Sequence, residues 1–249
     1  MTKLISKEEM RQQFKSYRLR AHLTQKHVER TVETIQGLWR QSRKNRLDMW
    51  DSLSKLNQNM KKEPITGTEI KKAFRDFICT QQEERCCYCR QWLFRVAHAK
   101  PIDHIFPKKH YPHYSLHFWN LAVCCADCNR LKGETVWGDF CKKRFGYPQP
   151  NECEEFYHPR FHKYDQHIRF VHIGTNHGVI SVYKGITPQG RFLCTKLLHK
   201  VAAERMLLSS TPLLGSAIEQ IEEYRATVAS RPKLEAFLQA LDNAVLDVI

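Results

Sequence analysis

The chain has 249 residues, of which 42% are hydrophobic, so it is long and apolar enough to fold around a sizeable core. No run approaches the roughly 20 apolar residues that span a bilayer, and the charged segment Met1–Glu9 lacks the apolar core of a signal peptide. We therefore expect a cytoplasmic protein that does not enter a membrane. Lysine and arginine total 40 against 26 acidic residues, a formal charge of +14, which favours a polyanionic partner and nucleic acid above all.

Residues 1–80 have the pattern of a basic helical region. Apolar residues recur there at helical spacing, and the outer face is rich in lysine and arginine. Two capping boxes mark helix starts: Ser6 with Glu9, and Thr66 with Glu69. The second box predicts a helix over residues 67–80. The sequence leaves open whether the basic face contacts DNA or is only solvated.

Two C-x-x-C pairs stand out among the ten cysteines: Cys86 with Cys89, and Cys125 with Cys128. Disulfides are rare in a reducing cytoplasm, so cysteine spacing there indicates metal ligation first. Two such pairs complete a tetrahedral thiolate shell, which predicts a structural Zn²⁺ site. The alternative, a redox dithiol, lacks a thioredoxin-like strand and helix around either pair. A long insertion, residues 90–124, separates the pairs.

The other cysteines fall outside this spacing. Cys87 and Cys124 are predicted to be small buried neighbours of the zinc site. The remaining four are predicted to be core residues: Cys79, Cys141, Cys153 and Cys194. A second zinc site built from Cys141, Cys153, His158 and His162 is the weaker alternative, because its spacing is irregular.

The insertion and its borders contain an ordered set of polar residues. A strand-like run, residues 102–107, carries Asp103 and His104 side by side. A second strand-like run, residues 119–125, carries Asn120 and leads into a helix that begins near Ala126. The predicted order is strand, loop, strand and helix, with a cysteine pair at either end.

This arrangement resembles the HNH endonuclease family, whose ββα-metal fold is stapled by four cysteines in many members. The resemblance covers residues 86–140 and rests on six features: Cys86/Cys89, Asp103-His104, Asn120-Leu121, Cys125/Cys128, Asn129 and Lys132-Gly133. The last signature position is often histidine and here is Asn129, an H-N-N variant. The resemblance implies an α+β, mainly helical fold with a zinc-stapled ββα-metal core over residues 81–145.

The resemblance also implies roles for individual residues. Asp103 and Asn129 would present oxygen ligands to a hard catalytic cation, Mg²⁺ or Mn²⁺. His104 would be the general base that activates the attacking water, since an imidazole titrates near neutral pH. The cation would stabilise charge on the scissile phosphate.

Other residues would support this chemistry. Asn120 would brace the loop between the strands and orient His104. Arg130 and Lys132, on the helix near the cation, would hold flanking phosphates, although Lys132 alone could equally be solvated. Three histidines of the loop are predicted to be solvated: His110, His113 and His117.

Residues 146–249 are predicted to form a β-hairpin followed by a helical region. The strand-like runs are Ile168–Ile173 and Val179–Tyr183, and the first helix opens at Thr187-Pro188. The last helix follows Pro232 and carries an apolar stripe: Leu234, Phe237, Leu238, Leu241, Val245 and Val248. We expect this stripe to pack internally, with docking of a partner as the alternative.

The expected function is therefore metal-dependent hydrolysis of phosphodiester bonds in nucleic acid, with double-stranded DNA expected over RNA. One such site nicks one strand, and double-strand cleavage would need a homodimer or two nicks. By family analogy, the chain looks like a restriction enzyme or an anti-phage effector that acts beside an ATPase subunit. The alternatives are a catalytically silent, zinc-dependent nucleic-acid-binding module and a partner-dependent subunit or scaffold.

Overall fold

The computed structural model describes residues 4–20, 28–58, 65–93, 100–138, 146–175 and 178–209. Within these ranges the chain is a mixed α+β protein with three two-stranded antiparallel sheets. Two predicted features lie outside the described residues: the helix after Pro232, and Cys141. No described helix is both long and apolar enough to cross a membrane.

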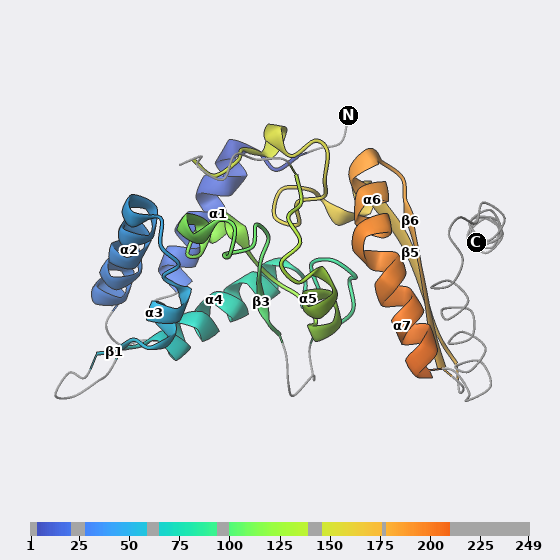
Figure 1. Cartoon of the computed structure of the whole chain (residues 1–249), viewed down its shortest axis with the longest axis horizontal. Coiled ribbons are helices and arrows are strands. Elements are labelled where there is room, and N and C mark those ends of the chain that lie inside the picture. The colour runs from blue at the N-terminus through green and yellow to red at the C-terminus, as the bar shows by residue number, and fades with distance from the viewer. Residues whose placement is uncertain are drawn as a thin grey trace.

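The N-terminal region forms the four helices seen at one end and the centre of Figure 1. They are α1 (Lys7–Arg20), α2 (Val28–Asn45), α3 (Trp50–Ser54) and α4 (Gly67–Gln81). A short pair, β1 (Asn57–Gln58) and β2 (Ile65–Thr66), precedes α4. The predicted box before α1 is confirmed: Ser6 N donates to Glu9 Oε2 at 2.7 Å, and Glu9 N donates to Ser6 Oγ at 3.1 Å.

The predicted capping box before α4 forms a different pair of hydrogen bonds. Glu69 N donates to Thr66 Oγ1 at 3.3 Å, and the Thr66 hydroxyl donates to Glu69 Oε2 at 2.8 Å. Helix α4 then buries Ile70, Phe74 and Phe77 on one face, which packs towards the central hairpin. The helix therefore carries the chain from the N-terminal region directly to the first cysteine pair.

The central unit is the predicted strand–loop–strand–helix. It consists of β3 (Ile102–His104), β4 (Leu121–Val123) and α5 (Ala126–Lys132), with Asp103 opposite Ala122 in the register. Both strands are shorter than predicted. Beyond His104, Ile105 N donates to the Asn120 carbonyl at 2.8 Å, and Phe106 N then donates to the side-chain Oδ1 of Asn120 at 2.8 Å, so a side chain takes over where backbone pairing ends.

The loop between β3 and β4 is buried rather than solvated. It includes the 3₁₀ turns Pro112–Tyr114 and Phe118–Asn120. His113 is only 2% exposed, and the Nδ1 atom of His117 is buried without a partner. The prediction that these two histidines are solvated was therefore wrong. The physical reason is an aromatic cluster that surrounds the loop: Phe106, Tyr111, Tyr114, Tyr147 and Phe156.

The C-terminal part of the described chain is a hairpin covered by helices (Figure 1). Strands β5 (Ile168–Thr175) and β6 (Gly178–Gly185) pair along their whole length, which confirms and extends the two predicted strands. Helix α6 (Pro188–Leu193) continues through a π-helical turn, Cys194–Leu198, into α7 (His199–Ser209). The predicted cap is confirmed, since Gly190 N donates to Thr187 Oγ1 at 3.1 Å.

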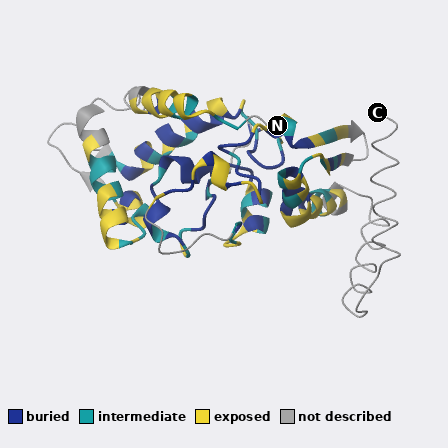
Figure 2. Ribbon diagram, turned by 90° about the horizontal axis from the view of Figure 1, so that it is seen from above, coloured by how far each residue is buried: buried dark blue, intermediate teal, exposed yellow. Residues whose placement is uncertain are grey.

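One continuous core cluster runs through all three predicted regions, from Tyr17 through the cysteines of the central unit to Val201. Figure 2 shows this burial concentrated in the middle of the molecule, with exposed faces on the outer helices. Two 3₁₀ turns, Pro150–Glu152 and Tyr164–Gln166, flank the connection that leads from the central unit to β5. The cysteine pairs therefore lie at the centre of the fold.

Candidate metal centre and active site

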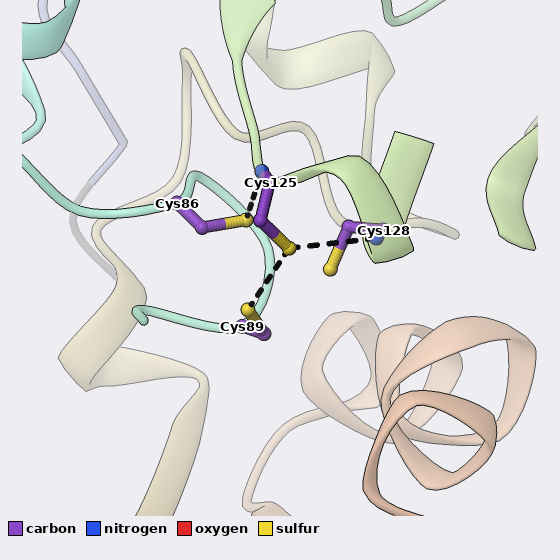
Figure 3. A group of neighbouring side chains, drawn as sticks. All are labelled: Cys86, Cys89, Cys125 and Cys128. Atoms are coloured by element: carbon purple, nitrogen blue, oxygen red, sulfur yellow. Dashed lines mark hydrogen bonds between the residues drawn. The ribbon is translucent and has the colours of Figure 1, made fainter. Parts of the chain in front are cut away.

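The four predicted cysteines converge on one point (Figure 3). The sulfurs of Cys86, Cys89, Cys125 and Cys128 all lie within 4.8 Å of one another, and Cys89 Sγ is 3.7 Å from Cys125 Sγ. Four thiolates at about 2.3 Å from a tetrahedral Zn²⁺ are roughly 3.8 Å apart. The group can therefore hold a metal ion such as zinc.

Backbone geometry presents these sulfurs. The first pair lies in a tight turn: Cys86 N donates to Gln91 O at 2.8 Å, and Arg90 N donates to Cys86 O at 3.0 Å. Arg90 adopts a positive φ of 58°, which closes this turn. In the second pair, Cys125 is the N-cap of α5, and its sulfur accepts from Cys128 N at 3.5 Å. Amide donors at a helix start stabilise a thiolate.

The four thiols share one buried site, and the ionisation of each depends on the others. Burial raises the pKa of Cys86 well above its usual value, whereas hydrogen bonds from the other cysteines, Cys125 first, lower the pKa of Cys89. Four buried thiolates repel one another, so a cation is needed before all four can ionise together. Cys87 and Cys124 are 4% and 0% exposed and belong to the neighbouring core, as predicted.

One residue that the sequence did not single out contacts the cluster. Arg205, on α7, donates from Nη2 to Cys89 Sγ at 3.4 Å and to Cys125 Sγ at 3.5 Å. The same guanidinium pairs with Asp127 Oδ2 at 3.2 Å. A guanidinium beside two sulfurs offsets part of their negative charge. Only the docking of α7 on the central unit reveals this contact, and no local sequence signal marks it.

Asp103 is buried in an ion pair. Lys132 Nζ lies 3.1 Å from Asp103 Oδ2 and 3.2 Å from Oδ1, and both side chains are at most 6% exposed. Tyr88 donates its hydroxyl to Asp103 Oδ2 at 2.6 Å. Lys132 Nζ also donates to the carbonyl of His104 at 2.9 Å. The structure thus brings Lys132 into the centre of the candidate site, where it has no solvent-exposed end for a flanking phosphate.

His104 is held by the β3–β4 loop. Its Nε2 lies 3.0 Å from the carbonyl oxygen of Ser115, and because a carbonyl only accepts, Nε2 carries the proton. The indole of Trp50, on α3, meets the imidazole edge-on at 4.9 Å between ring centroids. Burial lowers the pKa of His104 to about 4, so the expectation that this imidazole titrates near neutral pH was wrong, and the ring is a weaker base than predicted. At neutral pH the imidazole is therefore uncharged, with its lone pair on Nδ1.

Asn120 joins the two ends of the same loop. Its Oδ1 accepts from Phe106 N at 2.8 Å, and its Nδ2 donates to the carbonyls of Phe106 and Tyr114, both at 3.1 Å. Asn120 is fully buried. The Tyr114 carbonyl neighbours Ser115, whose own carbonyl holds His104. This is the arrangement that a bracing role requires.

The remaining predicted residues lie on α5. Asn129 is in the first turn, and its Oδ1 lies 3.9 Å from Cys124 Sγ. Arg130 is exposed and forms an ion pair with Glu204 of α7. Neither contact commits the side chain to the core, so both can reorient towards a ligand.

Asp103 carries oxygen donors of the type that a hard cation prefers, but most of them are already engaged. A carboxylate offers about four lone-pair positions, and Tyr88 and Lys132 occupy about three of those on Asp103. The amide oxygen of Asn129 is a donor of the same type, but its contact is with Cys124 Sγ and not with Asp103. Lys132 competes with a cation for Asp103. Among the described residues, the four cysteines are the only group of three or more histidine, cysteine or acidic ligands.

The alternative second zinc site finds no support in the described residues. Both ring nitrogens of His158 have partners: Nε2 lies 2.8 Å from Tyr147 Oη, and Nδ1 accepts from Arg160 N at 3.3 Å. His162 Nδ1 accepts from His158 N at 2.9 Å. Cys153 is fully buried and directs its sulfur to the carbonyl of Gln149 at 3.6 Å. These side chains are built into the core.

Comparison of the chain with models of protein families, with curated proteins and with solved structures found no match. The functional argument therefore rests on the residues of the site and their geometry.

Proposed function

We propose that this chain is a metal-dependent endonuclease of the HNH type, which hydrolyses phosphodiester bonds in double-stranded DNA. The observation that carries the proposal is the environment of His104. Its Nε2 proton is held by Ser115 O at 3.0 Å, which leaves the lone pair of the imidazole on Nδ1, and Asp103 is the preceding residue of β3. A binding module without catalysis has no need for this pair.

Each residue has a defined task in this proposal. His104 Nδ1 takes a proton from the attacking water, which an uncharged imidazole can do at neutral pH. Asn120 fixes the loop that carries Ser115 and so keeps the imidazole in one orientation. Asp103 and Asn129 would hold Mg²⁺ or Mn²⁺, which would supply charge stabilisation at the scissile phosphate and leaving oxygen. Arg130 contacts a neighbouring phosphate after it leaves Glu204.

The four-cysteine cluster, in this proposal, holds a structural zinc ion. Its ligands come from the turn before the hairpin and from the start of α5, so the ion fixes both ends of the unit that carries Asp103, His104 and Asn129. The charge of +14 supports a nucleic-acid substrate. Roles in restriction or anti-phage defence, and an ATPase partner or a homodimer, extend the same proposal.

A second candidate is a subunit that stays silent until a partner binds. Two observations favour it. Lys132 occupies the carboxylate of Asp103, and Trp50 of the N-terminal helices lies against the ring of His104. Opening of the site would then require Lys132 to release Asp103.

Cleavage of supercoiled plasmid tests the proposal. The zinc-loaded chain is incubated with plasmid and with Mg²⁺, Mn²⁺ or no added divalent cation; omission is preferable to a chelator, which would also strip the cysteine site. His104→Ala is the test variant and His110→Ala, in the same loop, is the matched control. We expect cation-dependent nicking by the parent and His110→Ala, and at least a 100-fold loss in His104→Ala, which is the usual contribution of a general base.

The outcomes separate the two candidates. Equal nicking by His104→Ala would remove His104 as the base. If the parent binds plasmid but leaves it intact, and Lys132→Met restores cleavage, the silent-subunit candidate is the correct one. If neither protein cuts under any condition and neither gains activity with proteins encoded beside it, the nuclease proposal fails.

A further inference from the structure

A pair of buried serines lies between α2 and the loop that holds His104. Ser42 belongs to α2 and Ser115 to the β3–β4 loop, and both are fully buried although 73 residues separate them. Their hydroxyl oxygens lie 3.4 Å from each other. A hydroxyl is costly to bury unless it is hydrogen-bonded, so the partners of this serine pair show what the two residues hold in place.

Each polar group of Ser115 has a partner. Its N–H donates to Pro112 O at 3.1 Å, and its hydroxyl oxygen accepts from Met49 N at 3.1 Å. Because Met49 uses that oxygen as an acceptor, the hydroxyl proton of Ser115 is free to be donated to Ser42 Oγ. The remaining group, the carbonyl, accepts the Nε2 proton of His104 at 3.0 Å. The residue that orients the imidazole is therefore itself fixed through its amide and its hydroxyl.

Ser42 connects Ser115 to the end of α2. The Ser42 hydroxyl lies 2.8 Å from the carbonyl of Leu47 and 3.2 Å from the carbonyl of Pro112, and it can donate its proton to either. Leu47 N donates back to Ser42 O at 3.2 Å. Helix α2 also packs against the 3₁₀ turn that precedes Ser115. The end of α2 and the β3–β4 loop therefore share one hydrogen-bonded contact.

This contact fixes the loop from the side opposite to Asn120. The Asn120 amide holds the carbonyl of Tyr114 from the β4 side, and the serine pair holds the next residue from the α2 side. Trp50, which follows the amide donor Met49, meets the imidazole of His104 edge-on. Groups of the N-terminal helical region thus complete the support of His104, which residues 81–145 do not supply alone.

We propose that Ser42 is a positioning residue of the candidate active site, which keeps the carbonyl of Ser115, and through it the imidazole of His104, in one orientation. The proposal rests on the proposed function for the role of His104, but the hydrogen bond of the ring can be measured without cleavage. A displacement of the carbonyl by about 1 Å breaks this hydrogen bond, and misplacement of that size lowers a catalytic rate by up to about 100-fold.

Nuclear magnetic resonance of the zinc-loaded full chain, with isotope-labelled histidine nitrogens and without DNA, tests the proposal. The measured quantity is the exchange rate of the His104 Nε2 proton with water, and the signal is assigned by its absence from His104→Ala. Ser42→Ala and Ser115→Ala each remove one hydroxyl of the pair. Ser181→Ala is the matched control, because Ser181 is also buried and its hydroxyl lies 2.8 Å from Nδ1 of His172.

We expect the Nε2 proton to exchange about fivefold faster or more in Ser42→Ala and in Ser115→Ala than in the parent and in Ser181→Ala. The double variant should exchange no faster than Ser115→Ala, because both substitutions remove the same contact. In the plasmid assay, Ser42→Ala should lower kcat by about tenfold and leave KM unchanged, since Ser42 acts on the orientation of the base and not on substrate binding.

The proposal is overturned if the Nε2 proton of the parent exchanges too fast to be observed, or if Ser42→Ala leaves its exchange rate unchanged. Additive effects of Ser42→Ala and Ser115→Ala would also overturn it, because the hydroxyls would then act separately. Should Ser42→Ala fail to fold, Ser115→Ala decides by the same exchange rate. If no variant and no parent cuts plasmid, the nuclease proposal fails, whereas faster exchange in Ser42→Ala would still establish that Ser42 holds the ring.

Discussion

The two main hairpins of this chain are held together in different ways. In β5–β6, eight residues of each strand pair in register, and α6 and α7 cover the ladder. In β3–β4, only three residues of each strand pair, which is too short a ladder to be stable by itself. The shorter hairpin depends instead on buried side chains at its ends: the cysteine cluster, the Asp103–Lys132 pair and Asn120.

The difference has a functional consequence. In a regular ladder the backbone N–H and C=O groups pair with one another, and side chains are not needed as their hydrogen-bond partners. The β3–β4 unit uses side chains for that purpose, and so it can hold a carboxylate and an imidazole at fixed positions near the surface of the core. We infer that the central unit depends on its side-chain contacts, and that their loss weakens it before β5–β6, although the two hairpins share one continuous core.

Loss of the proposed zinc ion should have the largest effect. Structural zinc contributes about 10–16 kcal/mol to the folding of small zinc domains, which is comparable to the roughly 5–15 kcal/mol that stabilises a whole protein. Cys89→Ser should therefore abolish metal content and unfold β3–β4, while amides of β5–β6 exchange more slowly. Elemental analysis and hydrogen exchange measure the two results.

The matched control is Cys87→Ala, a buried cysteine beside the cluster but outside it. We expect it to retain one metal ion per chain. Equal metal loss in both variants, or uniform exchange over both hairpins in Cys89→Ser, would show that the two units do not separate.

The buried ion pair should have the next effect. Lys132→Met leaves the carboxylate of Asp103 buried, with Tyr88 as its remaining partner, and removal of one member of a buried pair costs about 3–5 kcal/mol. Denaturant unfolding measures the change. The double variant with Asp103→Asn should recover part of the loss, because no charge then remains buried.

Lys109→Met supplies the comparison for this experiment. Lys109 pairs with Glu134, but both side chains are more than 60% exposed, so the expected loss is below about 1 kcal/mol. A similar cost for Lys109→Met and Lys132→Met would mean that burial of the Asp103 pair does not matter.

A substitution in α6, which covers the other hairpin, should leave the metal centre intact. A Cβ atom built on Gly190 would lie 1.8 Å from the carbonyl oxygen of His167, so Gly190→Ala must displace α6 from β5–β6. Overpacking of this kind costs about 1–3 kcal/mol. Gly37→Ala, in α2, meets nothing within 4 Å and should stabilise the helix slightly. Metal loss in Gly190→Ala would contradict the separation of the two units.

Local signals in the sequence predicted much of this fold. The boxes at Ser6 and Thr66, the cap at Thr187 and the paired strands of β5–β6 are each encoded within a few residues. Spacing alone also predicted the four-cysteine cluster, because each pair acts as one local unit. The length of β3 was overestimated, since its ladder stops where the Asn120 side chain takes over.

Less of the candidate site than of the fold could be predicted from the sequence. The contact of Arg205 with the sulfurs and the pairing of Lys132 with Asp103 each join residues far apart in the chain. The burial of His113 depends on Tyr111 and Tyr114 of its own turn and on α2, which packs against that turn, and no periodicity indicates this contact. Such contacts follow from tertiary packing, and they determine whether a polar residue is solvated, paired or poised for reaction.

The last prediction, whose effect is absent at neutral pH, concerns the loop between β3 and β4. Burial lowers the pKa of His117 to about 3, against roughly 6.5 in an unfolded chain. The unfolded state therefore binds the proton first, so stability is complete above pH 6.5 and is lost as the pH falls towards 3, by about 1.4 kcal/mol per pH unit. His117→Phe keeps a ring against Tyr147, 4.2 Å away, and removes this titration.

The measurement is the free energy of unfolding of both proteins between pH 7 and pH 4. Protonation of the metal ligands also lowers stability in acid, but both proteins share those ligands, so the difference between the curves isolates His117. We expect the curves to converge or cross as the pH falls, with His117→Phe the less sensitive. Parallel curves would mean that groups other than His117 take up the protons that destabilise the fold. The β3–β4 loop would then tolerate a charged imidazole at this position.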